Sequence, residues 1–438
     1  MLKTFKGGIH PEYNKEYTNR KPVERAKLPS KVIIPMSQHV GAPCEPIVKV
    51  GDTVKVGQKI GEAKAPVSAP VHASVSGKVI AIEPRPHPSG ALVMSVVIES
   101  DGKDEIYEGI NPPKPLEELT PDEIKTIIRE AGIVGMGGAG FPTQVKLSPP
   151  SGKTIDTIIV NGAECEPYLT SDHRLMVEHP EDVVFGLLAI MKATGVKKGY
   201  IGIENNKPDA IEAIKKAAKG FEGIEVVELD TKYPQGGEKQ LINAITGREV
   251  PSGGLPMDVH VIVDNAGTCA AIAKALKTGM PLIERITTVT GTGVNEPKNL
   301  LIRIGTPFNE IIEQCGGFKG EVGKVIMGGP MMGLAQGLLD VPVIKGTSGI
   351  LVLQKKDVNV EEPSNCIRCA KCVDACPIHL LPTTLAKFAQ KGKWIEAEQY
   401  HAMDCIECGC CAYVCPAHIP LTQWIRLAKN NIVMSKKK

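Results

Sequence analysis

Runs of apolar residues separated by turn-forming residues predict that the chain begins with a β-rich module. Between residues 30 and 100, short Val and Ile runs alternate with Gly, Pro and Asp. Within this stretch, residues 48–54 (VKVGDTV) have the alternation and the central Gly-Asp of two strands joined by a turn. We therefore predict a β module over residues 1–110.

A helix with complete end signals is predicted next, over residues 115–132. Thr120 has the side chain of an N-cap residue, Pro121 fits the first helical position, and Glu123 completes a capping box. Regularly spaced isoleucines give the segment one apolar face, and Gly132 is a helix-ending residue. This helix opens the second predicted domain, which covers residues 111–280.

Alternating strand and helix patterns in this second domain predict a Rossmann-like α/β fold with a mostly parallel sheet. The predicted strands cover residues 155–160, 199–203, 224–229 and 259–263, and the predicted helices cover residues 182–192, 209–219, 238–246 and 269–276. A smaller β-β-α-β pattern at 284–335 predicts a third domain over residues 281–358. The cysteine-rich remainder, residues 359–438, is predicted to be largely helical.

Charge and hydropathy exclude several classes of protein. The formal net charge is only +2, without the basic excess of a nucleic-acid-binding protein. The longest apolar run, residues 183–191, is far shorter than the ~20 residues that span a bilayer. The N-terminal residues MLKTFKGGIHPEY lack the apolar core of a signal peptide. We expect a chain that binds no nucleic acid, crosses no membrane and is cytoplasmic.

Cysteine is the most informative residue type, because nine of the thirteen cysteines lie between Cys366 and Cys415. Two runs share the spacing Cys-x2-Cys-x2-Cys-x3-Cys-Pro of bacterial ferredoxins, in which the fourth cysteine ligates the other cluster. Structural zinc is the alternative, but zinc sites usually combine pairs of Cys or Cys with His. The spacing predicts one [4Fe–4S] cluster on Cys366, Cys369, Cys372 and Cys415, and a second on Cys405, Cys408, Cys411 and Cys376.

The segment between the two runs, TTLAKFAQKGKWIEAEQY, has a helical pattern, which favours a helical ferredoxin domain. Five cysteines remain outside the predicted ligand sets, and we expect each to be a small buried thiol. They are Cys44, Cys165, Cys269, Cys315 and Cys410.

A glycine-rich loop follows the first predicted helix. Residues 135–140 (GMGGAG) match G-x-G-x-x-G, but a helix precedes them and Phe141-Pro142 follows, so the context of a dinucleotide fingerprint is missing. Four glycines followed by Lys146 still predict backbone N–H groups close to an anion, with a flexible turn as the alternative.

Polar residues also follow three of the predicted strands. Asn161 and Glu164 come after the first strand, Glu204 after the second, and Asn265 after the fourth. Because the carboxyl ends of parallel strands share one edge of the sheet, where open α/β sheets bind ligands, we expect these residues to converge.

Together these motifs resemble known families. The sequence GxGGAGFPTxxK, followed by an Asn-x-x-Glu-x-Glu-Pro loop, resembles the NADH- and FMN-binding subunit of respiratory complex I. The unit at 284–335 resembles that family's soluble-ligand-binding β-grasp domain, and VxxGDxVxxGQ resembles biotinyl/lipoyl-type barrel-sandwich domains. Over nearly all 438 residues, the chain resembles the C subunit of the Rnf complex, which combines these parts with two ferredoxin-type clusters.

The resemblance implies an FMN site and an adjoining NAD(H) site. The residues implied for FMN are Gly135, Gly137, Gly138, Lys146, Asn161, Glu164, Asn265 and Thr268, with Lys146 and the glycine amides toward the phosphate. Phe141, Glu166 and Glu204 would face the nicotinamide nucleotide, and the two carboxylates would disfavour the extra phosphate of NADPH. The chain departs from complex I at Ala163, where complex I has Asp, and at Met136, where it has Arg.

The three kinds of cofactor form a consistent set. NAD(H) exchanges a hydride, each cluster carries one electron, and a flavin can exchange either a hydride or single electrons. The resemblance implies a peripheral subunit on the cytoplasmic face of the cell membrane, within a ferredoxin:NAD+ oxidoreductase complex. Other Rnf subunits would be its partners and would couple the redox reaction to ion translocation, with ferredoxin as an indirect partner. Hydride transfer requires no side-chain acid or base, so no catalytic residue is predicted.

Two other functions remain open. The first is a flavin-less iron–sulfur electron-transfer subunit. The second is a carrier function of the N-terminal module, centred on Lys64. Lys64 is followed by Ala65 to Pro70 (APVSAP) and lacks the Met-Lys-Met or Asp-Lys-Ala surroundings of a modified lysine, so a structural β module is preferred.

Overall fold

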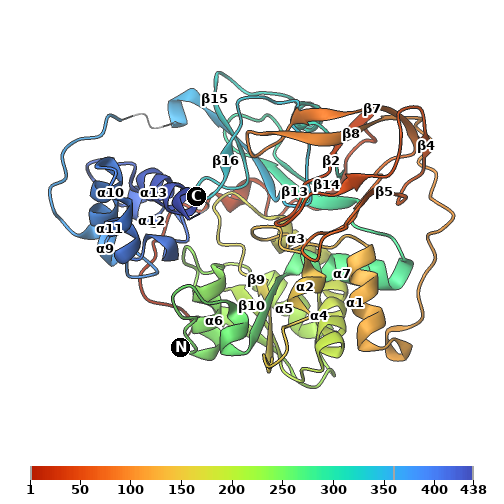
Figure 1. Ribbon diagram of the computed structural model, residues 1–438, viewed down its shortest axis with the longest axis horizontal. Coiled ribbons are helices and arrows are strands. Elements are labelled where there is room, and N and C mark those ends of the chain that lie inside the picture. The colour runs from red at the N-terminus through yellow and green to blue at the C-terminus, as the bar shows by residue number, and fades with distance from the viewer. Residues whose placement is uncertain (1, 359–360, 437–438) are drawn as a thin grey trace.

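The computed structural model describes residues 2–358 and 361–436 and has four parts (Figure 1). The helices of the C-terminal part lie at one end, the α/β part adjoins them, and the N-terminal β module lies at the far end. The predicted fold class is confirmed. None of the described helices is long and apolar enough to cross a membrane.

The N-terminal module consists of two antiparallel sheets. One has the order β2 (Lys31–Pro35), β8 (Leu92–Ser100), β7 (Gly77–Pro86) and β4 (Thr53–Val54), and the other has the order β3 (Glu45–Pro46), β5 (Lys59–Glu62) and β6 (Val71–His72). Val32 pairs with Ile98 and Ile34 with Val96, and all four are buried between the sheets. The predicted first strand of the 48–54 hairpin does not form, because only Thr53–Val54 pairs with β7.

The predicted capping box at Thr120 is confirmed. Oγ1 of Thr120 accepts the backbone N–H of Glu123 at 3.3 Å, and Oε2 of Glu123 accepts the N–H of Thr120 at 2.7 Å. Helix α1 therefore spans Pro121–Glu130, six residues shorter at its start than predicted, after the 3-10 helix η2 (Leu116–Glu118).

The predicted parallel sheet of the second domain is also confirmed. Its order is β11 (Ile224–Leu229), β10 (Gly199–Glu204), β9 (Thr157–Gly162) and β12 (Val261–Asn265), and all three pairings are parallel. The helices are α4 (Pro180–Thr194), α5 (Pro208–Ala217), α6 (Glu238–Thr246) and α7 (Ala266–Thr278), together with α2 (Thr143–Lys146) and α3 (Ser171–Glu178), which the patterns did not predict.

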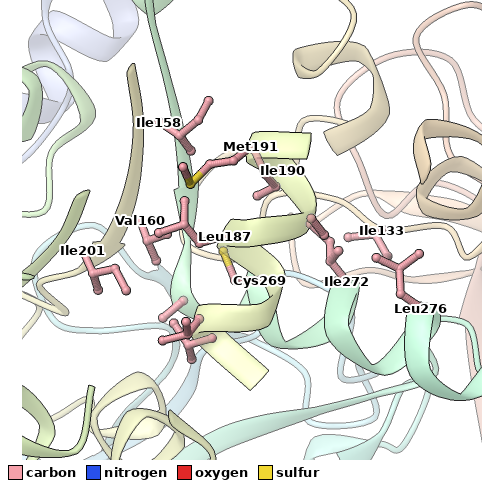
Figure 2. Close-up of a cluster of buried hydrophobic side chains, with 14 of the residues drawn as sticks. Ile133, Ile158, Val160, Leu187, Ile190, Met191, Ile201, Cys269, Ile272 and Leu276 are labelled. Carbon is pink, nitrogen blue, oxygen red and sulfur yellow. The ribbon is translucent and has the colours of Figure 1, made fainter. Parts of the chain in front are cut away.

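Close packing of α4 against α7 forms the core of this domain (Figure 2). A Cβ on Gly186 of α4 would lie 2.2 Å from the backbone oxygen of Cys269 on α7, so only glycine permits this approach. Leu187 and Ile190 of α4 are fully buried between the sheet and Ile272 of α7. Burial of each such side chain contributes about 1.5–3 kcal/mol.

The third part is a six-stranded sheet that contains the predicted β-β-α-β unit. Its order is β1 (Val23–Arg25), β14 (Lys298–Arg303), β13 (Glu284–Thr290), β17 (Gly349–Gln354), β15 (Val322–Met327) and β16 (Leu334–Ala335), and α8 (Phe308–Gln314) packs against it. Strand β1 pairs in parallel with β14, so the N-terminal segment reaches this sheet before it enters its own module.

The C-terminal part consists of two similar halves with an offset of 39 residues. Helices α9 (Lys371–Asp374) and α10 (Pro382–Gln390) correspond to α12 (Cys410–Tyr413) and α13 (Leu421–Ser435), and α11 (Trp394–Gln399) connects the halves. Left-handed residues recur with the same offset, at Arg368, Ala370 and His379 and again at Glu407, Gly409 and His418. The remaining 3-10 helices are η1 (Lys15–Tyr17), η3 (Pro256–Val259), η4 (Lys355–Asp357) and η5 (Ala402–Asp404).

Candidate functional site

A cavity of about 470 Å³ lies at the carboxyl edge of the parallel sheet. From β9 the chain runs outward through β10 to β11 and then returns to place β12 on the other side of β9. This reversal makes the β9–β12 edge the point where open α/β sheets bind ligands. Asn161 from β9 and Asp264 and Asn265 from β12 line the cavity. We call it the nucleotide cavity.

Nine of the eleven residues predicted to contact FMN or NAD(H) line the nucleotide cavity. They are Gly135, Gly137, Gly138, Phe141, Lys146, Asn161, Glu164, Glu166 and Asn265. The other two, Thr268 and Glu204, lie behind its wall. Glu204 ends β10, one strand away from the reversal, and its fully buried carboxylate pairs with Nζ of Lys207 at 3.0 Å. This arrangement therefore does not favour direct contact between Glu204 and a nucleotide.

The glycine loop is fixed to the start of α7. Oγ1 of Thr268 accepts a hydrogen bond from the backbone N–H of Met136 at 3.0 Å, which is the role that the structure gives Thr268. A Cβ on Gly137 would lie 2.7 Å from Nδ2 of Asn265, whereas one on Gly138 would meet no atom within 4 Å. Glycine thus lets the loop lie against Asn265 while its next residue stays open to a ligand.

Lys146 places an ammonium group at the wall of the cavity. Its Nζ donates to the backbone oxygen of Val263 at 2.9 Å and to Oδ1 of Asp264 at 3.0 Å. Burial is the largest single influence and lowers the pKa of Lys146, but the charges of Asp264 and Glu238 and the hydrogen bond to Asp264 together raise it above its usual value, so the ammonium stays protonated. Two of its three donors are used, which leaves one for a ligand.

Asp264 adds an acceptor to the same wall. Its side chain is fully buried, and its Oδ2 has no hydrogen-bond partner among the described residues. Burial raises the pKa of Asp264 and the ammonium of Lys146 opposes the rise. A buried oxygen without a partner is costly, so this atom is suited to accept a hydrogen bond from a ligand hydroxyl.

Glu164 caps the unpredicted helix α3. Its backbone is left-handed, with φ of 47°, and this turns its carboxylate toward the first turn of α3. There it accepts hydrogen bonds from Oγ of Ser171 at 3.2 Å and from the backbone N–H groups of Asp172 and His173 at 2.7 and 3.1 Å. Negative charge is stabilised at this position by the helix dipole.

Glu166 joins the nucleotide cavity to the third part of the chain. Its carboxylate accepts the backbone N–H groups of Met331 at 3.1 Å and Met332 at 2.8 Å. Burial raises the pKa of Glu166 to about 7, and the two N–H groups oppose that rise. A carboxyl that titrates near neutral pH therefore lies at the cavity wall.

Two buried lysines, which the sequence patterns did not indicate, donate to backbone oxygens of residues 163–169, which we call the acidic loop. Lys15, from the N-terminal segment, donates to the backbone oxygens of Glu164, Glu166 and Leu169 at 2.8, 3.0 and 2.7 Å. Lys207 donates to the backbone oxygen of Ala163 at 2.6 Å. Burial lowers the pKa of Lys15 to about 8. The Lys15 contacts join positions about 150 residues apart and the Lys207 contact joins positions 44 residues apart, so no local motif could have revealed them.

The residues of the nucleotide cavity fit FMN by chemistry. The glycine amides and the free donor of Lys146 suit a phosphate, and Oδ2 of Asp264 suits a ribityl hydroxyl. The side chain of Phe141 adds an aromatic surface. The volume lies within the range of about 300–1,000 Å³ that is ordinary for ligand pockets.

Four of the predicted cluster ligands line one small pocket in the C-terminal part. They are Cys376 from the first run and Cys405, Cys408 and Cys411 from the second, which is the predicted combination. Backbone N–H groups donate to two of the sulfurs, from Leu380 to Cys376 at 3.3 Å and from Glu407 to Cys405 at 3.4 Å. Four thiols, two of which accept backbone N–H donors, fit the ligand set of a [4Fe–4S] cluster.

The other predicted ligand set is nearer to the surface. Cys372 and Cys415 pack in one apolar cluster, Cys366 accepts the N–H of Arg368 at 3.4 Å, and Cys369 is exposed. Within residues 2–358 and 361–436, no three His, Cys, Asp or Glu side chains lie close enough together to hold a single metal ion. The five cysteines outside the ligand sets are all buried, as predicted.

The nucleotide cavity and the Cys405–Cys411 pocket share a wall. Ile406 lines both of them. Tyr233, another residue that the sequence patterns missed, lines the nucleotide cavity and donates from its hydroxyl to the backbone oxygen of Cys408 at 2.8 Å. Of the two predicted ligand sets, the one with Cys405, Cys408 and Cys411 is therefore the set whose pocket adjoins the cavity.

Comparisons with known proteins identify the same parts in the same order. Residues 3–103 match the RnfC barrel sandwich hybrid domain, 128–274 the Nuo51 FMN-binding domain, 286–335 the SLBB domain and 365–419 the 4Fe-4S dicluster domain.

Full-length relatives are similar over almost the whole chain. The chain is 58% identical over 435 residues to the C subunit of the Na(+)-translocating ferredoxin:NAD(+) oxidoreductase complex of Acetobacterium woodii, covering 99% of this chain and 98% of that one. It is 56% identical to the C subunit of the proton-translocating ferredoxin:NAD(+) oxidoreductase complex of Clostridium ljungdahlii, with 98% and 94% covered. It is 44% identical to the C subunit of the ion-translocating oxidoreductase complex of Rhodobacter capsulatus, with 98% and 83% covered.

Proposed function

The chain belongs to the family of C subunits of ion-translocating ferredoxin:NAD+ oxidoreductase (Rnf) complexes, and from this premise we propose that it joins NAD(H) to the complex through FMN and two [4Fe–4S] clusters. It acts at the cytoplasmic face of the cell membrane as a peripheral subunit held by the other Rnf subunits. The observation that carries the proposal is the wall shared by the nucleotide cavity and the Cys405–Cys411 pocket.

The four parts have separate tasks within the proposed subunit. Residues 111–280 hold FMN and NAD(H), residues 359–438 hold the two clusters, and residues 1–110 and 281–358 support both. Contacts across these boundaries are consistent with this division, since Lys15 from the first part and Met331 from the third both fix the acidic loop of the second.

Bound FMN would exchange a hydride with NAD(H) and single electrons with a cluster. The residues of the chain bind and orient it. Lys146 and the amides of the glycine loop would hold the phosphate, Asp264 would accept a ribityl hydroxyl, and Asn161 and Asn265 would lie beside the flavin. Glu166 and Phe141 would lie beside the nicotinamide nucleotide.

The proposed electron path crosses two cluster sites in order. Because Ile406 and Tyr233 separate the nucleotide cavity from the Cys405–Cys411 pocket, the cluster held there with Cys376 is next to the flavin. The cluster of Cys366, Cys369, Cys372 and Cys415 then exchanges electrons with a partner subunit, since Cys369 is exposed.

The proposal is tested by loading the purified full chain with FMN, iron and sulfide under anaerobic conditions. We expect one FMN and about eight irons per chain, four for each cluster. Addition of NADH should bleach the flavin and cluster absorption, and NADPH should do so less effectively because Glu166 lines the cavity. A chain with full iron content that binds no FMN would instead be a flavin-less electron-transfer subunit.

A further inference from the structure

Tyr233 occupies the wall between the nucleotide cavity and the adjacent cluster site. Its side chain is only 1% exposed, and it packs in one apolar cluster with Cys165, Cys408 and Cys410. Tyr233 lines the nucleotide cavity, while its hydroxyl donates to the backbone oxygen of Cys408 at 2.8 Å. One side chain thus touches both the predicted flavin site and a predicted cluster ligand.

The backbone of Tyr233 is fixed from the opposite side. Its N–H donates to the backbone oxygen of Ile9 at 2.9 Å, and its own oxygen accepts the N–H of Ile9 at 2.8 Å. The preceding residue of that segment, Gly8, donates to the backbone oxygen of Ala375 at 2.9 Å. The N-terminal segment therefore ties Tyr233 to the first cysteine run as well, next to Cys376.

The hydrogen bond from the Tyr233 hydroxyl to the backbone oxygen of Cys408 lies in the protein interior. The oxygen of Cys408 is buried with this donor, and a buried carbonyl that loses its donor costs about 1–3 kcal/mol. Loss of the hydroxyl is therefore expected to let the Cys408 peptide move.

We propose that Tyr233 is a positioning residue that holds the loop of Cys405, Cys408 and Cys411 against the nucleotide cavity, and so sets the rate of electron exchange between FMN and the cluster on that loop. This inference rests on the proposed function. It assigns Tyr233 no chemical step of its own.

The electron balance requires no further reactant. When NADH is oxidised, NAD+ and one proton are released, and two electrons pass singly to two oxidised clusters, each of which is reduced by one electron. No bond of Tyr233 forms or breaks, and the phenol is neither oxidised nor deprotonated.

The test compares Tyr233→Phe, Tyr233→Leu and a control, Tyr13→Phe, in the full chain loaded with FMN and clusters. Tyr13 also donates from its hydroxyl to a backbone oxygen, that of Thr231 at 3.3 Å, but it does not line the nucleotide cavity. Anaerobic stopped-flow mixing with NADH separates reduction of the flavin from reduction of the clusters. A redox titration followed by electron paramagnetic resonance reports the cluster itself, independently of turnover.

We expect flavin reduction by NADH to stay within about twofold of wild type, while cluster reduction slows about threefold in Tyr233→Phe and about tenfold in Tyr233→Leu. The resonance signal of the Cys405–Cys411 cluster should change in both variants and not in Tyr13→Phe. Selective loss of that cluster's iron from Tyr233→Phe would also support the inference, because it would show that the loop needs this hydrogen bond.

Unchanged cluster reduction and an unchanged signal in fully loaded Tyr233→Phe would overturn the role of Tyr233. Equal slowing of flavin and cluster reduction would overturn it too, since the defect would then lie in nucleotide binding. Failure of the proposed function has a different signature, in which wild type itself binds no FMN or is not reduced by NADH.

Discussion

Replacement of Lys146 by Met separates two roles that the structure gives this ammonium. One is to neutralise the fully buried Asp264, whose Oδ1 lies 3.0 Å from Nζ. The other is to offer its remaining donor to the FMN phosphate. Loss of a hydrogen bond to a charged group costs about 1.5–3 kcal/mol. The dissociation constant for FMN should therefore rise by about tenfold to about a hundredfold.

The double variant Lys146→Met/Asp264→Asn, compared with Asp264→Asn alone, distinguishes these roles. Lys146→Met alone leaves a buried carboxylate without its partner, which destabilises a protein by about 3–5 kcal/mol. Conversion of Asp264 to Asn removes that uncompensated charge, so thermal stability should largely recover while FMN affinity stays low. FMN binding is followed by quenching of its fluorescence on addition of FMN-free protein, and iron content serves as the control.

Two results would refute this reasoning. If the double variant binds FMN as tightly as wild type, Lys146 acts only through Asp264 and does not contact the phosphate. If iron content falls together with FMN binding in Lys146→Met, the flavin and cluster sites are not separable as the geometry requires.

Three further predictions concern the supports of the two sites. Lys15→Met removes three hydrogen bonds to the acidic loop and should weaken FMN binding by about tenfold or more. The control Lys21→Met removes one exposed hydrogen bond to Pro297 and should leave FMN binding unchanged. Equal effects of the two variants in fluorescence titrations would exclude a specific role for Lys15. Cys376→Ser should damage the cluster of the second cysteine run, as measured by iron analysis and electron paramagnetic resonance. The control Cys410→Ser should keep both clusters. Damage in Cys376→Ser that is confined to the cluster of the first run would exclude ligation across the runs. The pKa of Glu166 rises from 4.5 to about 7 on folding, so the folded chain binds more protons than the unfolded chain between these pH values. The free energy of unfolding should therefore fall as pH rises through that window. Glu166→Gln should flatten the pH dependence of the unfolding temperature of the FMN-free protein, and an unchanged slope would contradict the assigned pKa.

Local signals predicted the parts of the fold that local physics determines. The capping box at Thr120 set the start of α1, and β-branched runs gave all four strands of the parallel sheet within about two residues. Cysteine spacing led to the combination of Cys376 with the second run, which the structure brings to one pocket.

The signals failed where long-range pairing decides the structure. The segment 48–50 has a strand pattern but no described strand partner, and β1 leaves its own module to pair with β14. Helix α3 was missed because its first turn is capped by Glu164, seven residues earlier, rather than by a residue directly before it.

In the nucleotide site, too, local motifs predicted some residues and missed those that long-range contacts bring there. The glycine loop and the strand ends identified most of the wall, yet Glu204 was assigned to it because the order of the strands was unknown. Lys15 and Tyr233 carry no motif: the path of the N-terminal segment brings Lys15 to the site, and the segment between β11 and α6 brings Tyr233 there. The functional importance of such residues can be recognised only from the folded structure.

The central claim is that electrons pass between NAD(H) and the clusters only through the flavin in the nucleotide cavity. The most direct test is rapid mixing of NADH with the fully clustered chain, with and without FMN, followed by freezing and electron paramagnetic resonance. With FMN, reduced-cluster signals should appear, and without FMN they should be absent although iron content is the same. Equal cluster reduction in both samples, or no reduction in either, would contradict the account.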